Sequence, residues 1–361
     1  MSSQIGNKIK VTVFGESHGP AIGMVMDNPP VGLKLDFDYI SEQNKRRAPG
    51  NDKTATPRKE ADEPEFLSGV KNGVTTGDPI AVSIRNTNTK SGDYESLRQT
   101  PRPSHADYAT FAKTGEYIPA GGGHFSGRLT APLVTAGAIL RLHLKQKGIE
   151  IGGHILKIGA AEDSRFDPVK VDAETLISLS KSKFALLNPE AEEKMRTEVE
   201  AARMDGDSIG GIVEIAVTGL PAGLGGPMFE GVENELAKAV FGIPAVKGIE
   251  FGAGFDFAEM RGSKANDQMY YEGENVRCLT NNNGGITGGI TNAMPIIFRV
   301  AIKPTPSISK PQQTVDLKSG TNTEIVIKGR HDPCIVPRAL PAIEAVTAIA
   351  IANLTEGAEN Q

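Results

Sequence analysis

The 361-residue chain has no tryptophan, only two cysteines, and an aromatic content of 5%. So few aromatic side chains leave little for the stacking platforms that bind single-stranded nucleic acid. Cys278 and Cys334 lie far apart and match no zinc or redox spacing, so we expect reduced thiols in a cytoplasmic protein. No apolar run reaches the roughly 18 residues of a transmembrane helix. The polar N-terminus lacks the apolar region of a signal peptide, which argues against secretion.

Acidic residues slightly outnumber basic ones, and the charge is not spread evenly along the chain. The net charge is −5, which argues against a dedicated nucleic-acid binder. Residues 43–60 nevertheless carry six cations and only two acidic residues. A basic segment in an acidic protein suggests a focused anion site. Charge alone, however, favours the simpler interpretation of a solvated surface loop.

Glycine is the residue in excess, with 41 in the chain. The glycines form clusters instead of a regular repeat, which excludes a collagen-like or solenoid architecture. Clustered glycines in a globular chain indicate tight turns or backbone that approaches a ligand closely. The clusters are residues 121–123, 210–211, 225–226, 284–285 and 288–289.

The hydrophobic pattern predicts strands and helices interleaved without a regular alternation. Strands are expected at residues 9–14, 22–26, 80–85, 211–218, 296–302 and 324–327. Helices are expected from a cap at Asp36 through residue 40 toward residue 47, from a cap at Ser126 through residue 144, and at residues 172–180, 189–203, 229–240 and 339–353. Strands in adjacent pairs favour an α+β fold with antiparallel sheets. No linker is evident, so we expect one domain over residues 1–361 with a frayed tail from about residue 356.

Four of the six histidines lie in loops rich in glycine, proline or arginine: His18, His105, His124 and His331. A single histidine is more often structural than catalytic, but four in such contexts favour a functional site. None shows a metal-ligand spacing. We therefore expect acid–base and anion contacts, with no metal.

Three segments combine glycine or proline with cations and hydroxyls. Residues 121–128 precede a helix N-terminus, where free N–H groups favour an anion, although they match neither a Walker A loop nor a dinucleotide fingerprint. Residues 303–307 offer a lysine and two hydroxyls that suit a phosphate. Residues 329–333 place a guanidinium, an imidazole and a carboxylate in one turn. Each segment alone also has a purely structural explanation: a capped helix start, a strand exit and a surface turn.

Taken together and in order, these segments resemble the chorismate synthase family in its bacterial-type, monofunctional form. Residues 14–19, Phe-Gly-Glu-Ser-His-Gly, look like the first signature of that family. Residues 102–108, 121–137 and 330–333 look like its later ones, and residues 244–250, 284–289 and 303–307 also fit. The resemblance extends from residue 5 to about residue 350.

The resemblance implies a β-α-β sandwich, with helices between antiparallel sheets, assembled as a homotetramer. It implies a carbon–oxygen lyase that performs the anti-1,4-elimination of phosphate from 5-O-(1-carboxyvinyl)-3-phosphoshikimate. The product is chorismate, in the last step of the shikimate pathway of aromatic amino acid biosynthesis. The family requires reduced FMN without net redox change. The chain length favours the form that takes reduced flavin from an external reductase, so NADPH alone is not expected to support turnover.

The resemblance also implies a role for individual residues. His18 would protonate the departing phosphate, His105 would keep the reduced flavin suitably protonated, and Asp332 would assist deprotonation on the N5 side of the flavin. The substrate anions would be bound by Ser17, Arg47, Lys53 and Arg128. The FMN site would consist of His124, Phe125, Ser126, Pro244, Ala245, Gly288, Lys303, Pro304, Thr305, Pro306, Ser307 and Arg330.

Two other functions remain open at this point. Another FMN-dependent reductase with an anionic substrate would use the same basic pocket, but it needs a nicotinamide site for which no independent motif is evident. A non-catalytic anion-binding or RNA-binding module would explain the basic segment but not the histidines. We therefore expect a small-molecule substrate and neither a nucleic-acid nor a membrane partner.

Overall fold

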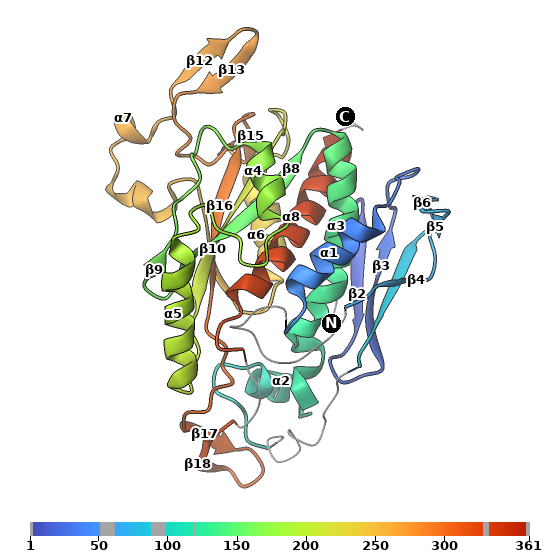
Figure 1. The fold of residues 1–361 in the computed structure, drawn as a ribbon, viewed down its shortest axis with the longest axis vertical. Coiled ribbons are helices and arrows are strands. Elements are labelled where there is room, and N and C mark those ends of the chain that lie inside the picture. The colour runs from blue at the N-terminus through green and yellow to red at the C-terminus, as the bar shows by residue number, and fades with distance from the viewer. Residues whose placement is uncertain (1–2, 51–61, 88–98, 118–119, 328–331, 359–361) are drawn as a thin grey trace.

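The computed structural model describes residues 3–50, 62–87, 99–117, 120–327 and 332–358. Its framework is two five-stranded sheets, and each neighbouring pair of strands in them is antiparallel (Figure 1). The first sheet has the order β1 (Gln4–Ile5), β2 (Lys10–Gly15), β3 (Ala21–Asp27), β7 (Ile80–Arg85) and β4 (Glu65–Phe66). The second has the order β11 (Val246–Phe251), β16 (Ile296–Ile302), β10 (Gly211–Thr218), β8 (Glu150–Ile158) and β9 (Ala161–Glu162).

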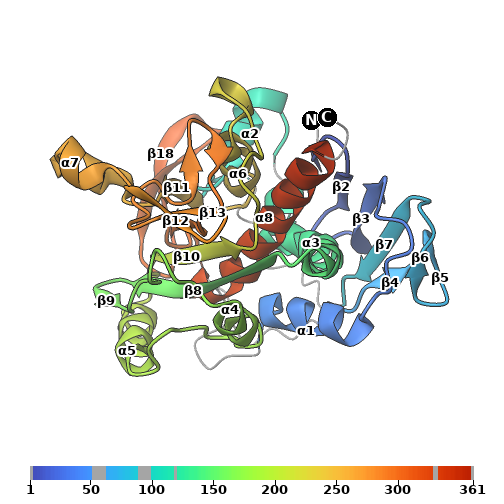
Figure 2. The same ribbon diagram turned by 90° about the horizontal axis from the view of Figure 1, so that it is seen from above.

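Helices fill the space between the two sheets (Figure 2). Helix α3 (Thr130–Gln146) packs on β2, β3 and β7, whereas α8 (Val336–Ala358) packs on β8 and β10. The two helices also pack on each other, and α1 (Phe37–Arg47) contacts both. Helix α6 (Val232–Phe241) lies against α8 and β11. These layers confirm the predicted α+β fold with helices between antiparallel sheets.

The remaining elements lie around this framework. They are the hairpins β5 (Val70–Lys71)–β6 (Val74–Thr75), β12 (Met269–Glu272)–β13 (Asn275–Cys278), β14 (Ile286–Thr287)–β15 (Ile290–Thr291) and β17 (Gln312–Asp316)–β18 (Thr321–Ile325). The helices among them are α2 (Asp107–Thr114), α4 (Ala173–Leu179), α5 (Ala191–Met204) and α7 (Gly262–Ala265). Helix α2 and the β17–β18 hairpin lie near one another at one end of the molecule (Figure 1).

Local sequence patterns explain several of these elements. In β3 the side chains of Ile22, Met24 and Met26 are all fully buried, as a period of two requires. Strands β7, β10 and β16 have the predicted bounds. The predicted cap of α1 is confirmed, because the Asp36 carboxylate accepts a hydrogen bond from the backbone N–H of Tyr39 at 2.9 Å.

Other elements differ from the prediction. Ser126 caps a short 3₁₀ turn, Gly127–Leu129, and α3 begins only at Thr130. Strands β8 and β11 were not predicted. In β8 two glycines interrupt the apolar pattern, because a Cβ at Gly152 or Gly153 would lie within 3.0 Å of neighbouring atoms. Helix α8 continues to Ala358, past the expected start of the frayed tail.

Among the described residues, α8 alone is long and apolar enough to cross a membrane by length and composition. However, 78% of that apolar stretch is buried inside the molecule. Its apolar character therefore follows from its position between the two sheets, where it forms much of the core.

A buried charge cluster joins the central helices. Glu344 of α8 accepts from Arg46 of α1 at 2.6 Å and from Arg141 of α3 at 3.3 Å. Its other oxygen accepts from the backbone N–H of Gly153 in β8 at 3.1 Å. All three side chains are buried. The carboxylate therefore compensates two cations that have lost their contact with water.

Replacing Glu344 by glutamine is expected to lower the free energy of unfolding by about 3–5 kcal/mol, because it leaves two buried cations without a counter-charge. Denaturant unfolding measures the loss. The matched control is Glu200→Gln, since Glu200 pairs with Arg203 at an exposed site, where water screens the charges and the pair adds little stability. Equal losses in the two variants would contradict the assignment.

Candidate active site

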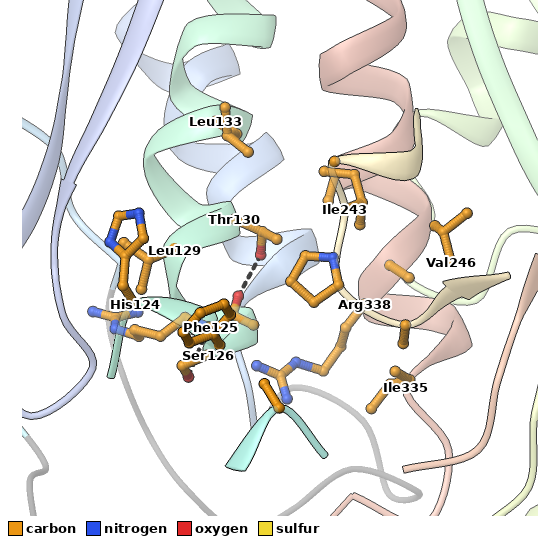
Figure 3. A pocket seen from close by; sticks show the side chains of 18 of the residues that line it. His124, Phe125, Ser126, Leu129, Thr130, Leu133, Ile243, Val246, Ile335 and Arg338 are labelled. Atoms are coloured by element: carbon orange, nitrogen blue, oxygen red, sulfur yellow. Dashed lines mark hydrogen bonds between the residues drawn. The ribbon is translucent and has the colours of Figure 1, made fainter. Parts of the chain in front are cut away.

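Segments from both halves of the chain line one cavity of about 810 Å³. One wall comes from the start of α3 with His124, Phe125 and Ser126, and the opposite wall comes from Ile243 before β11 and Arg338 of α8 (Figure 3). Residues 102–106 and 303–307 contribute further lining. The volume is within the range of about 300–1,000 Å³ typical of small-molecule sites.

Two of the predicted catalytic histidines pack against the triple-glycine segment. Gly121, Gly122 and Gly123 have φ values of 72°, 92° and 54°, a backbone region that residues with a Cβ rarely adopt. A Cβ at Gly121 would lie 2.0 Å from Cε1 of His18, and a Cβ at Gly122 would lie 3.3 Å from Cε1 of His105. Consecutive glycines thus let two histidines that are 87 positions apart pack on one segment.

Ser17 joins the first signature to this segment. Its backbone N–H donates to Gly123 O at 3.3 Å, and its hydroxyl lies 3.2 Å from Nδ1 of His18. The same hydroxyl lies 3.4 Å from Gly121 O. The turn after β2 is therefore held against the glycines, and the His18 ring is held against Ser17.

The imidazole of His105 contacts the carboxylate of Asp107. Its Nδ1 lies 2.7 Å from Asp107, and Arg102 contacts the same carboxylate through Nε at 2.7 Å and Nη2 at 2.9 Å. Burial favours the neutral acid, but hydrogen bonds and charge from Arg102 and His105 outweigh it and hold the pKa of Asp107 well below its usual range. Asp107 is therefore an ionised group inside a largely buried cluster.

Arg47 and Arg128, the predicted substrate-binding arginines, share Asp62. Arg47 Nη1 donates to Asp62 Oδ2 at 2.5 Å, and Arg128 Nη1 donates to Asp62 Oδ1. All three residues are buried. Burial alone would raise the pKa of Asp62, but the charges of the two arginines lower it below the ordinary value. Both arginines line the cavity, so the Asp62 carboxylate neutralises two cations of the cavity wall.

The segment 303–307 closes another side. Lys303 Nζ donates to the carbonyl of Ser104 at 2.5 Å, and burial together with the charge of Lys247 lowers the pKa of Lys303. Thr305 Oγ1 is buried and has no hydrogen-bond partner among the described residues. Ala245 has a φ of 74°, an uncommon conformation for a non-glycine residue, and its carbonyl accepts from Lys303 N at 2.9 Å.

Asp332 lies at the cavity wall in an ion pair with Arg338 of α8. Arg338 also donates from Nε to the carbonyl of Arg47 at 3.1 Å. The guanidinium of Arg338 points toward the cavity (Figure 3). We did not predict this arginine from the sequence, although a cation in the first turn of an otherwise apolar helix was a signal for it.

Most of the residues predicted for the site line the cavity. Its lining includes Arg47, His105, His124, Phe125, Ser126, Arg128, Pro244, Ala245, Lys303, Thr305, Pro306, Ser307 and Asp332. His18 and Ser17 pack on Gly121, which lines the cavity. Pro304 is not part of the lining, and Gly288 lies in the β14–β15 turn. Lys53, Arg330 and His331 are outside the described residues.

His124 and four residues that were not predicted also belong to the cavity or its surroundings. His124 Nδ1 lies 2.9 Å from Gly15 O, so its ring also contacts the end of β2. Arg102, Lys247 and Arg338 add cations to the lining. Asp107 pairs with Arg102 and His105, which lie within five residues of it, so residues 102–107 held a local signal for this cluster. The contact of Arg338 with the carbonyl of Arg47 joins distant segments, and the linear pattern does not reveal it.

Comparison with known proteins decides the family. The family model described as "Chorismate synthase" matches residues 9–355. The chain belongs to the chorismate synthase family. A relative named chorismate synthase from Aeropyrum pernix is 48% identical over 351 residues, which cover 97% of this chain and 92% of the relative. One from Methanosarcina mazei is 46% identical over 350 residues, covering 96% and 94%.

A solved structure described as "Crystal Structure of Chorismate Synthase" has the same fold. It superposes with a TM-score of 0.76 at 28% identity, over 98% of this chain and 93% of that chain. The predicted family, fold class and enzyme class are thereby confirmed. The chain is a lyase of the shikimate pathway of aromatic amino acid biosynthesis, and the alternative of a flavin-dependent reductase finds no support.

Proposed function

We propose that this cavity eliminates phosphate from 5-O-(1-carboxyvinyl)-3-phosphoshikimate to give chorismate. The observation that carries the proposal is the glycine segment, which seats His18 and His105 beside a cavity lined by cations. The substrate has a phosphate and two carboxylates, and charge-assisted hydrogen bonds from guanidinium and ammonium groups suit all three. Arg128 and Arg338 are among the cavity cations that supply them.

The residues present fit reduced FMN as the cofactor. The cavity is large enough and has apolar walls from Leu133, Ile243 and Ala342, which suit a ring system. Thr305 offers a buried hydroxyl without a partner among the described residues, and buried hydroxyls are rarely left unsatisfied. An oxygen of the cofactor would satisfy it. Lys303 lies in the same segment and supplies positive charge for a phosphate.

We infer that FMN is held by the His124–Ser126 wall, by residues 244–245 and by residues 303–307. When bound, reduced FMN would supply an electron that assists phosphate loss and take it back as the hydrogen is lost, without net redox change. The protein's part is to place the substrate, exclude water and hold protons at defined atoms.

Proton transfer falls to the three predicted catalytic residues. His18 would protonate the departing phosphate, for which an imidazole is suited at neutral pH. The Ser17 hydroxyl at 3.2 Å from Nδ1 would hold the His18 ring in place. His105 would hold a proton at the flavin. Asp332 would accept one, and Arg338 fixes its carboxylate at the cavity wall.

Substrate binding would involve an exchange of partners. In this structure the charges of Arg47 and Arg128 are directed to Asp62. The phosphate or a carboxylate of the substrate would take over part of these contacts, since both are acceptors of the same kind. Lys53 and Arg330 remain proposed anion and flavin contacts that lie outside the described residues.

We further propose a single-domain cytoplasmic enzyme that works as a homotetramer and receives reduced FMN from an external reductase. Exposed apolar side chains support self-association. Phe229 and Phe255 are each 83% exposed, and Tyr271 in the β12–β13 hairpin is 78% exposed. An assembly that covers these side chains would remove them from water.

The deciding experiment is anaerobic phosphate release from the substrate. Chemically reduced FMN is expected to support release, and oxidised FMN is expected not to. Absence of release by folded protein with reduced FMN would overturn the proposed reaction. A parallel reaction with NADPH and oxidised FMN is expected to stay inactive. Turnover there would overturn the external reductase but leave the elimination in place.

A further inference from the structure

The side chains behind His105 form a compact cluster at the start of α2. Nδ1 of His105 lies 2.7 Å from Oδ1 of Asp107, and Arg102 donates to both oxygens of that carboxylate. The side chains of Arg102, Asp107 and His105 are 10%, 15% and 17% exposed. Since the cluster is mostly shielded from water, its hydrogen bonds have well-defined partners.

The contacts determine which nitrogen of His105 carries a hydrogen. Nη2 of Arg102 also lies 3.0 Å from Nδ1, so a bare Nδ1 could accept from Arg102. An ionised carboxylate can only accept, however, and a bare Nδ1 would then face Oδ1 of Asp107 at 2.7 Å with a lone pair on each side. Because the pKa of Asp107 is held low, the carboxylate is ionised at neutral pH. Nδ1 therefore carries the hydrogen.

The other ring nitrogen of His105, Nε2, lies next to Gly122. Nε2 of His105 would lie 3.4 Å from a Cβ placed on Gly122, and His105 itself lines the cavity. The preceding residue, Ser104, has a φ of 59°, and its carbonyl accepts from Lys303. An uncommon backbone conformation and a lysine contact thus hold the loop that carries His105.

The same cluster reaches the segment that we propose for the flavin. Nη1 of Arg102 lies 3.5 Å from the hydroxyl of Ser307. Asp107 also accepts from the backbone N–H of Arg102 at 3.0 Å and begins helix α2, where the helix dipole favours a carboxylate. Asp107 is therefore anchored by backbone and side chain, which suits a group that has to keep a neighbour in one orientation.

We propose that Asp107 is a positioning residue for His105. It keeps the hydrogen on Nδ1, so that Nε2 is the nitrogen available for proton exchange on the side of Gly122, and Arg102 holds Asp107 in place. The assignment deepens the proposed function and rests on it for the catalytic part. It goes beyond a local ion pair because it specifies one tautomer of one catalytic histidine.

The test is Asp107→Asn, which keeps the shape of the side chain but offers an N–H to Nδ1. The hydrogen of His105 is expected to move to Nε2. Long-range ¹H–¹⁵N NMR of protein labelled with ¹⁵N-histidine reads the tautomer directly, and His105→Gln assigns the signal among the six histidines. We expect kcat to fall by about 10²–10⁴-fold, the span of general acid–base catalysis. KM for the substrate should change less than about 3-fold, because Asp107 is not a proposed substrate contact.

Glu356→Gln is the matched control. Glu356 is the carboxylate partner of His143, at 2.8 Å from its Nε2, and neither residue lines the cavity. This variant should alter the signal of His143 and leave kcat unchanged. An Asp107→Asn protein with an unchanged tautomer or an unchanged kcat would overturn the proposal.

Two further outcomes are decisive as well. If Asp107→Asn fails to fold, the wild-type spectrum alone decides, because a bare Nδ1 at His105 overturns the proposal. The tautomer is read without turnover, so it separates this inference from the proposed function. Failure of wild-type phosphate release would overturn the reaction and with it the catalytic part, whereas the tautomer assignment would be judged by the spectrum.

Discussion

Replacing His18 by alanine is expected to lower kcat for phosphate release by about 10²–10⁴-fold, the usual contribution of a positioned general acid. Each tenfold loss corresponds to about 1.4 kcal/mol of activation free energy. The physical reason is that phosphate leaves with its negative charge unless a proton is supplied at that moment. His18 is the histidine that packs on Gly121, which lines the cavity, with its ring held by Ser17.

The measurement is single-turnover phosphate release under anaerobic conditions with reduced FMN, so that substrate binding and product release do not mask the chemical step. His143→Ala is the matched control, since His143 lies on α3 and contacts Glu356 instead of the cavity. The control should retain near-normal activity. Near-normal activity in His18→Ala would show that another group protonates the phosphate.

The second large effect is expected for Gly121→Ala, a change of one methyl group. The φ of Gly121 is 72°, and the new Cβ would lie 2.0 Å from Cε1 and 2.3 Å from Nδ1 of His18. The imidazole or the glycine segment has to move. A displacement of about 1 Å in a catalytic group costs about 10²-fold in rate, so kcat should fall at least that far.

Gly115→Ala separates this steric effect from backbone strain. Gly115 has a φ of 74°, but a Cβ there would meet nothing within 4 Å. Both variants should lose about 1–2 kcal/mol of folding free energy for the left-handed backbone, whereas only Gly121→Ala should lose activity. In the double variant with His18→Ala, the two activity losses should not add, because both act through the same ring. Additive losses would mean that Gly121 acts independently of His18.

Parts of the fold could be predicted because their signals are local. The alternation of apolar residues in β7, β10 and β16 shows which face each strand buries, and Asp36 caps α1 within three residues of its own position. Antiparallel pairing followed from strands that are adjacent in the chain. In β8, by contrast, Gly152 and Gly153 remove side chains from the pattern because neighbouring atoms occupy that space.

For the candidate site, too, some features could be predicted from the sequence and others could not. The order of the glycine, histidine and arginine segments along the chain was enough to indicate the family, and most of the residues predicted for the site line the cavity. Gly288 was also expected there, but it lies in the β14–β15 turn and does not line the cavity. A glycine cluster indicates a turn or a close approach, and the linear sequence does not distinguish the two.

By itself, the sequence determined the residue types of the site and the class of fold, because both depend on local composition, order and periodicity. Only the tertiary structure decided which charges meet. It paired Asp62 with Arg47 and Arg128, brought Arg338 to the cavity, and set His18 against Gly121. The reason is physical: the partner of a buried charge and the space around a glycine are set by packing between segments that are distant along the chain.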